Sequence, residues 1–313
     1  DHKGLGVERA DIVIEAIFED ADVKRSLYKD IEPRMKQGAI LATNTSSIPL
    51  EELSNALERP ERLVGLHFFN PVAMMQLVEV VRSETTSADV VAHAMTFTRQ
   101  IDRLPLPVTS TPGFLVNRIL MPYLMEAVLL EAEGIPPAVI DKAATDFGMP
   151  MGPVQLADTV GLDICLHVAE ILAGHFNAKV PERLRKLVDA GNLGRKSGRG
   201  FYEYRNGKPV RQKAATGTWN IDEISNRLVY RLLNESVSCI REQVVESDDL
   251  LDAGMIFGTG FAPFRGGPMH YIDAVGADVI NRQLQALEKL RGERFTPDSG
   301  WETLMQPSGG GSA

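Results

Sequence analysis

Apolar runs and amphipathic segments alternate over the first 109 residues of the chain, a pattern that predicts strands and helices in turn. ADIVIEAIF (residues 10–18) is typical of a strand with both faces buried in a parallel sheet. The helical spacing of residues 20–35 predicts a helix capped by Asp20 or Asp22, and GAILATNTSS (residues 38–47) predicts a strand that runs into a polar turn. The alternation continues with helices predicted over residues 48–57 and 87–101 and extended segments over residues 62–67, 76–81 and 104–110. We therefore predict a doubly wound α/β domain over residues 1–109.

Two neighbouring predicted strands place a histidine and a glutamate opposite each other. Asn70-Pro71 is a turn signal between these strands, so we expect them to fold back antiparallel. His67 and Glu79 then face each other within side-chain contact distance. A carboxylate bonded to one imidazole nitrogen fixes the tautomer and raises the basicity of the other nitrogen, which makes a general base. The alternative is a structural histidine at a strand end beside the glutamate of an amphipathic strand.

From Thr111 the pattern changes to helices alone. PGFLVNRILMPYLMEAVLLEAEG predicts a long helix that ends at Gly134, and further helical segments reach about residue 190. They are followed by GRKSGRGFYEYRNGKPV (residues 194–210), a basic, glycine-rich loop with a short strand-like end. A linker around residues 211–217 precedes a second helical block.

The second helical block repeats the first. VNRILMPYLMEAV (residues 116–128) aligns with SNRLVYRLLNESV (residues 225–237), and GPVQLADTVGLD (residues 152–163) aligns with GPMHYIDAVGAD (residues 267–278). This similarity in matching order predicts an internal duplication, with the two helical units packed around one shared core. The expected organisation is an α/β domain over 1–109, helical units over 110–210 and 218–300, and a flexible tail over 301–313.

The composition narrows the classes of function. Hydrophobic residues make up 44% of the chain and charged residues 24%, which is typical of a globular protein, and the net charge of -9 argues against nucleic-acid binding. Cys165 and Cys239 indicate a reducing compartment and no disulfide framework. With no apolar run of membrane-spanning length and no signal peptide, a cytoplasmic protein is expected. No metal site is predicted, because companions at metal-ligand spacing are lacking for His93, His167, His175 and His270.

Six motifs occur in the order seen in L-3-hydroxyacyl-CoA dehydrogenases, and the chain resembles this family from about residue 10 to residue 300. They are ADIVIEAIFED, TNTSS, GLHFFNPV with LVEVV, TPGFLVNRIL, FGMPMGPVQLAD and GRKSGRGFYEY. The second helical repeat resembles the alpha subunit of the fatty acid oxidation complex, which fuses enoyl-CoA hydratase to this dehydrogenase. The resemblance implies part of a Rossmann-type domain and oxidation of (S)-3-hydroxyacyl-CoA to 3-ketoacyl-CoA with NAD in fatty acid β-oxidation. It also implies an oligomer with a 3-ketoacyl-CoA thiolase as partner.

The family motifs carry roles onto individual residues of this chain. By resemblance, His67 removes the proton of the 3-hydroxyl group and Glu79 orients His67. Ser46 is placed beside the substrate and the nicotinamide, and Asn117 hydrogen-bonds the developing 3-keto oxygen. The positions that match NAD contacts in the family are Ala16, Glu19, Lys24, Asn70 and Ser46.

Structural interpretations of these residues stay open beside the functional ones. Ser46 fits a turn residue and Asn117 a helix-cap residue, while Glu19 and Lys24 fit a cap and a surface charge. Asn226, the duplicate of Asn117, lacks a preceding TPGF motif and is interpreted as structural. The loop GRKSGRG either attracts CoA phosphates or is a solvated surface loop.

One feature of the family is missing. The dinucleotide fingerprint G-x-G-x-x-G should follow the first strand of the sheet, and GLG at residues 4–6 lacks both a preceding strand and a third glycine. We therefore expect the sequence to begin inside the nucleotide-binding domain, with the first βαβ half and any hydratase domain upstream. By itself the chain is expected to bind NAD poorly or not at all.

Two other functions remain as alternatives. A short-chain 3-hydroxybutyryl-CoA dehydrogenase would share the chemistry, although the helical duplication argues against it. A non-catalytic helical module that docks a thiolase would not need His67, Glu79, Ser46 and Asn117 together.

Overall fold

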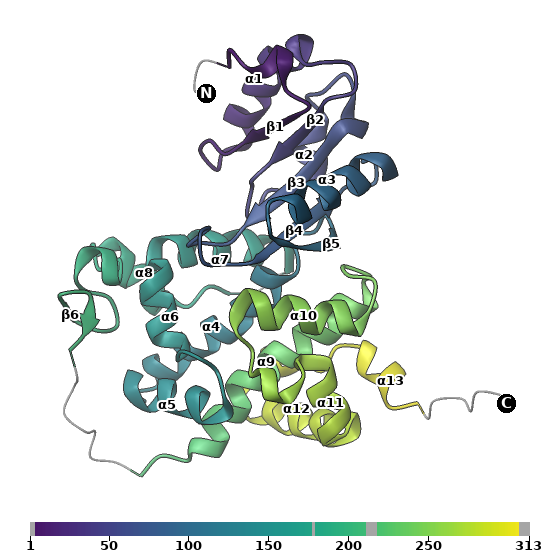
Figure 1. Cartoon of the computed structure of the whole chain (residues 1–313). Helices are drawn as coiled ribbons and strands as arrows, with labels where there is room; N and C mark the ends of the chain where they lie inside the picture. Colours follow the sequence, from purple (N-terminus) through teal and green to yellow (C-terminus); the bar gives the residue numbers. More distant parts are fainter. Residues whose placement is uncertain (1–3, 177–178, 211–217, 307–313) are drawn as a thin grey trace, which may run out of the picture. The chain divides into compact units, whose positions relative to one another are not determined.

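The computed structural model describes residues 4–176, 179–210 and 218–306, and the chain divides into two compact units (Figure 1). Unit 1 contains residues 1–115 and the segment 243–250, and unit 2 contains residues 116–242 and 251–313. The first boundary therefore lies after residue 115, not after residue 109 as expected. Most of both helical repeats lies in unit 2, whereas residues 243–250 of the second repeat belong to unit 1.

Unit 1 is built on a five-stranded sheet in the order β1-β2-β3-β4-β5. β1–β2, β2–β3 and β4–β5 are parallel pairs, whereas β3 and β4 are antiparallel as predicted. The elements are β1 (Ile12–Glu15), α1 (Ala21–Ile31), β2 (Ile40–Thr43), α2 (Leu50–Ser54), β3 (Leu63–Phe68), β4 (Leu77–Arg82), α3 (Ala88–Gln100) and β5 (Leu104–Thr109). Because the strand order follows the chain without reversal, the described residues form one side of a doubly wound sheet.

The first strand differs from its prediction. β1 is shorter than ADIVIEAIF and pairs only with β2, so it is an edge strand of the described sheet and not a strand buried on both faces. As a consequence, Ile14 is 42% exposed and Phe18, just beyond the strand, is 84% exposed. The apolar run correctly indicated a strand, but a run of this kind does not reveal how many neighbouring strands it pairs with in the sheet.

The core of the sheet follows the two-residue period of its strands. Ile40, Val64, Leu66 and Val80 belong to one buried cluster, against which residues of α3 pack. Side-chain caps fix the helix starts: Asp20 accepts a hydrogen bond from the backbone N–H of Val23, and Ser87 does the same for α3. These caps set where the chain leaves each strand end and enters the following helix.

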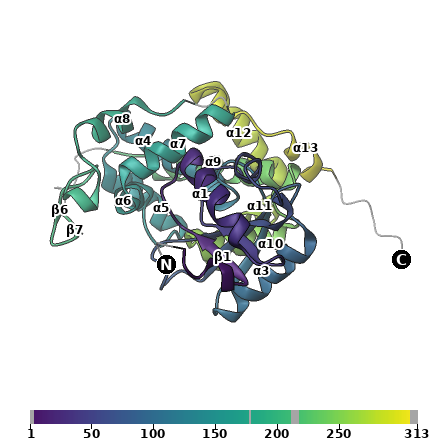
Figure 2. The same cartoon turned by 90° about the horizontal axis from the view of Figure 1, so that it is seen from above.

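In the part of unit 2 that the structure describes, helices are joined by one small hairpin, and the first three residues of one helix, α10, belong to unit 1. The helices of unit 2 are α4 (Val116–Ala132), α5 (Pro137–Phe147), α6 (Pro153–Val160), α7 (Leu162–Phe176), α8 (Glu182–Asp189), α9 (Ile221–Arg241), α10 (Asp248–Thr259), α11 (Pro268–Val275), α12 (Ala277–Arg291) and α13 (Gly300–Leu304), and the hairpin is β6 (Tyr204–Arg205) and β7 (Lys208–Pro209). The hairpin and α8 lie on the same side of unit 2 in both views (Figures 1 and 2). The repeats correspond helix by helix, α4–α7 to α9–α12, which agrees with the predicted duplication.

Equivalent aspartates make equivalent hydrogen bonds in the two repeats. Asp141 of α5 accepts a hydrogen bond from the first turn of α6, and Asp252 of α10 accepts one from the first turn of α11. A Cβ on Gly152 or Gly267 would approach these carboxylates to within 2.3 Å, so glycine is required at both helix starts. The same local device thus appears twice, which supports a common origin of the two repeats.

Ion pairs between the repeats are reciprocal. Arg118 of α4 pairs with Glu235 of α9 at 2.7 Å, and Arg227 of α9 pairs with Glu126 of α4 at 2.6 Å. Each arginine binds a second glutamate of the other repeat: Glu242 for Arg118 and Glu133 for Arg227. Because both arginines are buried, this exchange joins α4 and α9 through the centre of unit 2.

The C-terminal end differs from the flexible tail that was expected from residue 301. α13 spans Gly300–Leu304, and Trp301 is buried with its indole N–H donating to Asn234 of α9. This large side chain anchors the segment, whereas residues 307–313 and the predicted linker 211–217 lie outside the described residues. Among the helices that the structure describes, none is long and apolar enough to cross a membrane.

Candidate active site

His67 and Glu79 meet across the antiparallel pair β3–β4. The two residues are direct partners in the register, and the imidazole Nδ1 lies 2.6 Å from Oε2 of Glu79. The other carboxylate oxygen of Glu79, Oε1, accepts a hydrogen bond of 3.0 Å from the backbone N–H of Leu115. The facing geometry predicted from the sequence is therefore confirmed. Both oxygens of Glu79 are held, so the carboxylate fixes the imidazole plane.

Aromatic rings surround the imidazole. The ring centroid of His67 lies 4.5 Å from that of Phe69 and 5.6 Å from that of Phe114. His67 is 5% exposed and Glu79 is fully buried. In the part of the chain that the structure describes, no hydrogen bond engages Nε2 of His67. An imidazole with Nδ1 bonded to a buried carboxylate and Nε2 open to a ligand has the arrangement of a general base.

Glu19 organises the polar turn after β2. Its Oε1 accepts hydrogen bonds from the hydroxyl of Thr45 at 2.6 Å and from the backbone N–H groups of Ser46 and Ser47 at 2.7 and 3.1 Å. The hydroxyl of Ser46 lies 3.3 Å from the same oxygen. Glu19 is therefore not the helix cap that was the alternative for it. The cap is Asp20, and Glu19 shapes the turn that carries Ser46.

A buried ion-pair network lies under this turn. Lys24 is fully buried, with its ammonium 2.7 Å from Glu15 and 3.5 Å from Glu19. Glu15 also accepts hydrogen bonds of 2.9 Å from the hydroxyls of Tyr28 and Thr43. The alternative of an exposed surface charge for Lys24 is thus wrong, because the network takes the side chain into the core.

The network also acts on ionisation. Burial raises the pKa of Glu19, but the hydrogen bonds from Thr45 and Ser46 and the charge of Lys24 outweigh burial and leave this pKa below its usual value. Burial, and after it the charge of Glu15, raises the pKa of Tyr28. Glu19 is therefore an anion and Tyr28 a neutral hydrogen-bond donor at neutral pH.

The remaining predicted residues are distributed over both units. Ser46, Glu19 and Lys24 form one connected cluster in unit 1. Ala16 and Asn70 are exposed residues of unit 1, just after β1 and β3, and within the described ranges no side-chain hydrogen bond or ion pair joins them to the cluster. Asn117 is the second residue of α4 and belongs to unit 2.

Two polar residues of this region were missed by the sequence reasoning. Glu15 carries most of the buried network, and Asn44 accepts a hydrogen bond of 3.0 Å from the backbone N–H of Phe68 at the end of β3. A signal existed for Glu15, since it is a carboxylate with apolar residues on both sides in the run ADIVIEAIF, whereas Asp11 lies near the start of that run. For Asn44 the only signal in the sequence was its position directly after a predicted strand. In the described ranges no cluster of three or more metal-ligating side chains was found.

Comparison with protein families matches almost the whole chain. Residues 4–111 match the family described as 3-hydroxyacyl-CoA dehydrogenase, NAD binding domain. Residues 113–204 and 224–309 match the 3-hydroxyacyl-CoA dehydrogenase C-terminal domain. The C-terminal match in two segments coincides with the two helical repeats.

Curated relatives include the fatty acid oxidation complex subunit alpha of Idiomarina loihiensis, which is 39% identical over 306 residues, and that of Shewanella oneidensis, which is 40% identical over 306 residues. Both alignments cover 93% of this chain but 43% of the relative, so the chain spans less than half the length of these proteins. Both relatives therefore contain a further segment that has no counterpart here.

Solved structures give the same picture. The 3-hydroxybutyryl-CoA dehydrogenase of Escherichia coli K12 is similar with a TM-score of 0.85 and 27% identity, over 96% of this chain and 82% of that one. The dehydrogenase part of multifunctional enzyme 1 from C. elegans gives a TM-score of 0.65 and 29% identity, over 94% and 71% of the two chains.

Proposed function

The chain belongs to the 3-hydroxyacyl-CoA dehydrogenase family, and on this premise we propose that it oxidises (S)-3-hydroxyacyl-CoA to 3-ketoacyl-CoA with NAD, with His67 as the general base. The observation that carries the proposal is the buried His67–Glu79 pair with Nε2 unengaged by the described residues. The reaction needs one group that accepts the proton from the 3-hydroxyl oxygen while hydride leaves the carbon that bears this hydroxyl.

The pair suits this proton transfer. Nε2 accepts the proton of the 3-hydroxyl group, which makes His67 an imidazolium cation. Glu79 lies against Nδ1–H at 2.6 Å and stabilises that cation, while the backbone N–H of Leu115 keeps the carboxylate from turning away. In the reverse direction, the imidazolium returns the proton to the 3-keto oxygen. In this proposal Glu79 takes no part in the proton transfer itself and acts only by position and charge.

Two further residues complete the proposal by family resemblance. Asn117, from the TPGFLVN motif, donates a hydrogen bond to the substrate oxygen and stabilises the charge that develops there. Ser46 contacts substrate and cofactor from the turn that Glu19 organises, which supports a fixed orientation of its hydroxyl. These two assignments stay predictions.

The residues present fit one half of NAD. Ser46 and Asn70 offer hydroxyl and amide groups near the carboxyl ends of β2 and β3, where open α/β sheets bind ligands, and Ala16 leaves the backbone after β1 accessible. Lys24 is fully buried under this edge and supports it through Glu15 and Glu19. Within the described residues, no G-x-G-x-x-G loop follows a strand of the sheet to bind the pyrophosphate. When bound, NAD supplies the hydride acceptor of the reaction.

The wider context is proposed from the relatives. Curated relatives are named as subunits of a fatty acid oxidation complex, and we extend from them a role in β-oxidation, an oligomeric state and a 3-ketoacyl-CoA thiolase partner. An enoyl-CoA hydratase activity belongs to the longer protein in this proposal. A cytoplasmic location stays a prediction, supported by two buried cysteines that form no disulfide.

The reaction is tested with acetoacetyl-CoA, which drives the oxidation of NADH in reverse. The assay uses the chain joined to the part of the S. oneidensis relative that the alignment leaves unmatched, here called the completed chain. We expect NADH oxidation by the completed chain and little or none by the chain alone. A folded completed chain that binds NADH but does not oxidise it would contradict the proposal.

The alternatives are separated by two further measurements. A chain-length profile with 3-ketoacyl-CoA substrates distinguishes a β-oxidation enzyme from a short-chain 3-hydroxybutyryl-CoA dehydrogenase, which the Escherichia coli structure represents. Co-purification with a 3-ketoacyl-CoA thiolase tests the docking role. Thiolase binding that persists without any dehydrogenase activity would favour a helical docking module.

A further inference from the structure

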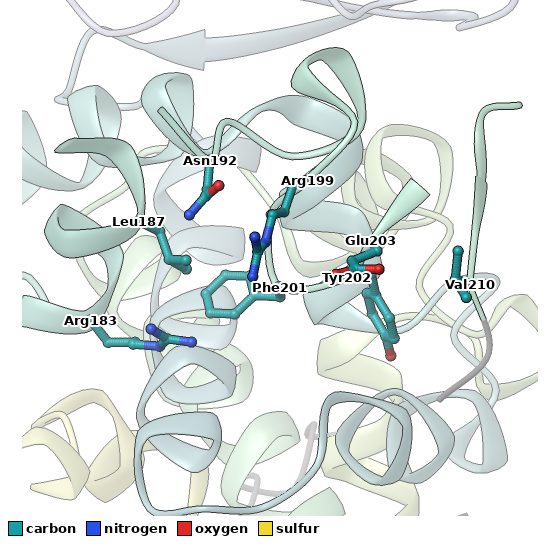
Figure 3. A pocket seen from close by; sticks show the side chains of 9 residues that line it. Arg183, Leu187, Asn192, Arg199, Phe201, Tyr202, Glu203 and Val210 are labelled. Carbon is teal, nitrogen blue, oxygen red and sulfur yellow. The ribbon is translucent and has the colours of Figure 1, made fainter. Parts of the chain in front are cut away.

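A cavity of about 400 Å³ lies in unit 2, between α8 and the loop and hairpin that follow it (Figure 3). It is lined by apolar and charged side chains together: Arg183, Leu187, Asn192, Arg199, Phe201 and Glu203. A volume of this size accommodates a small organic ligand. None of these residues has a part in the His67 mechanism.

The loop beside the cavity is basic although the protein is acidic. Residues 194–210 hold five cationic side chains, Arg195, Lys196, Arg199, Arg205 and Lys208, and one carboxylate, Glu203, in a chain whose net charge is -9. Lys196 is paired with Asp163, which leaves most of this positive charge uncompensated by the described residues. A local excess of one sign draws ligands of the opposite sign.

Two arginines line the cavity, and their positive charges are neutralised to different degrees by neighbouring carboxylates. Arg183 donates from Nε and Nη2 to Glu131, at 2.8 Å in each case, so one edge of its guanidinium is used. Arg199 is exposed, and within the described ranges its side chain has neither a hydrogen bond nor an ion pair, even to its bridge partner Glu203. Figure 3 shows both guanidinium groups pointing toward the ring of Phe201.

The loop that carries Arg199 is held in place by the core. Asp158 accepts hydrogen bonds from the backbone N–H groups of Phe201 and Tyr202 at 3.0 and 2.9 Å. A Cβ on Gly200 would lie 1.9 Å from Oδ1 of Asp158, so the close approach of loop and carboxylate requires glycine there. The Ser197 hydroxyl also donates within the loop, to the carbonyl of Arg199 at 2.8 Å. The position of Arg199 is thus set before any ligand binds, which lowers the entropic cost of binding.

We propose that this cavity binds a small organic phosphate monoester. The phosphate lies beside Arg199 and the free edge of Arg183, because guanidinium groups match phosphate oxygens in charge and geometry. The apolar or ring-bearing part of the ligand lies on Leu187 and Phe201. Glu203, at the other side of the cavity in Figure 3, disfavours a second anionic group and accepts a hydrogen bond from a hydroxyl or amino group.

Two sources can supply such a phosphate. One is the 3′-phosphoadenosine end of a CoA thioester, a choice that rests on the proposed function. The other is free inorganic phosphate, which shares the charge but has no apolar part. Binding in the cavity itself does not depend on the dehydrogenase activity, so the two proposals can fail separately.

The test is calorimetric titration of the full chain with adenosine 3′-monophosphate, inorganic phosphate and adenosine. The variant is Arg199→Gln, and Arg195→Gln is its matched control, since both remove one exposed charge from the same loop and only Arg199 lines the cavity. Thermal melting of both variants checks that the fold is intact. His67→Ala is titrated in parallel and is expected to bind like the parent chain.

We expect adenosine 3′-monophosphate to bind, adenosine not to bind, and Arg199→Gln to weaken binding about tenfold or more, while Arg195→Gln changes it by less than about twofold. Inorganic phosphate that binds as tightly as adenosine 3′-monophosphate, with the same loss in Arg199→Gln, supports a phosphate site at Arg199 but overturns the placement of an organic group on Leu187 and Phe201. The proposal is overturned if both variants weaken binding equally, since the cause is then the general field of the loop. It is overturned also if neither phosphate binds, or if adenosine binds as well as its phosphate.

Discussion

Removing the Arg227 side chain should destabilise unit 2 strongly. Arg227 is 1% exposed and binds two glutamates: its Nη2 lies 2.6 Å from Oε1 of Glu126 and its Nη1 lies 2.6 Å from Oε2 of Glu133. In Arg227→Met the buried Glu126 keeps, among the described residues, only its ion pair with Arg294, whose Nε lies 2.7 Å away. The methionine replaces the aliphatic part of the side chain, so the main loss is electrostatic.

The magnitude follows from this geometry. Breaking a buried ion pair by removing one partner costs about 3–5 kcal/mol, because an uncompensated charge stays behind. Since Arg294 compensates part of the charge on Glu126, we expect the lower end, about 3 kcal/mol. For a unit of this size that corresponds to a fall in Tm of roughly 6–12 °C. Arg282→Met is the matched control: it breaks an i,i+4 pair with Asp278 whose arginine is 65% exposed, so it should cost at most about 0.5 kcal/mol.

The assay is urea unfolding followed by tryptophan fluorescence. The two tryptophans of the chain, Trp219 and Trp301, both lie in unit 2, so the signal reports on this unit. A free energy of unfolding for Arg227→Met within about 1 kcal/mol of the parent, or equal to that of Arg282→Met, would refute the reasoning that the reciprocal pairs join the repeats.

Three further predictions concern the site and its surroundings. Glu79→Gln should slow turnover of the completed chain about 10- to 150-fold, since it weakens a charge-assisted hydrogen bond worth about 1.5–3 kcal/mol. The control Glu84→Gln, at an exposed position, should change turnover less than about twofold. Equal steady-state rates for the two variants would contradict the orienting role of Glu79. Lys24→Met leaves Glu15 and Glu19 without their shared cation, so it should lower the free energy of unfolding and weaken NADH binding in fluorescence titrations. Unchanged NADH affinity in a folded variant would show that the buried network is not needed to hold the turn of Ser46 for cofactor binding. Burial raises the pKa of Asp141 from 3.8 to about 6, although the hydrogen bonds that it accepts lower it. Its contribution to stability is therefore full below about pH 4 and is lost as the pH rises through about 6, a change of about 3 kcal/mol. The free energy of unfolding should vary less between pH 4 and 7 in Asp141→Asn than in the parent chain, and equal slopes would disprove this assignment.

Much of the fold was predictable because local patterns decide it. The two-residue period of the strands, the turn at Asn70-Pro71 and the antiparallel return were enough to place His67 opposite Glu79. The duplication was visible because equivalent residues, such as Arg118 and Arg227, keep their positions in the two repeats. What the sequence did not reveal is that these arginines exchange partners between repeats, since spacing within one helix gives no information about its neighbour.

The other differences have the same origin in tertiary contacts. Lys24 is buried because Glu15 and Glu19 approach it from outside its own helix, which no periodicity of α1 indicates. β1 is an edge strand because its second neighbour is absent from the described sheet, although its composition suits a central strand. Trp301 anchors α13 through one partner, Asn234, far away in the sequence. Local sequence indicates which elements form, but the partners of polar and terminal residues depend on the assembled unit.

The most direct test of the central claim is the rate of acetoacetyl-CoA reduction by the completed chain with His67→Ala, measured with and without added imidazole. The substitution removes the imidazole ring that contacts Phe69, Phe114 and Glu79, and we expect added imidazole to occupy the vacated position beside Glu79. With His67 as the general base, kcat should fall about 10²- to 10⁴-fold at unchanged NADH affinity, and imidazole should restore part of it. A His67→Ala variant that keeps its rate within about tenfold would contradict the account.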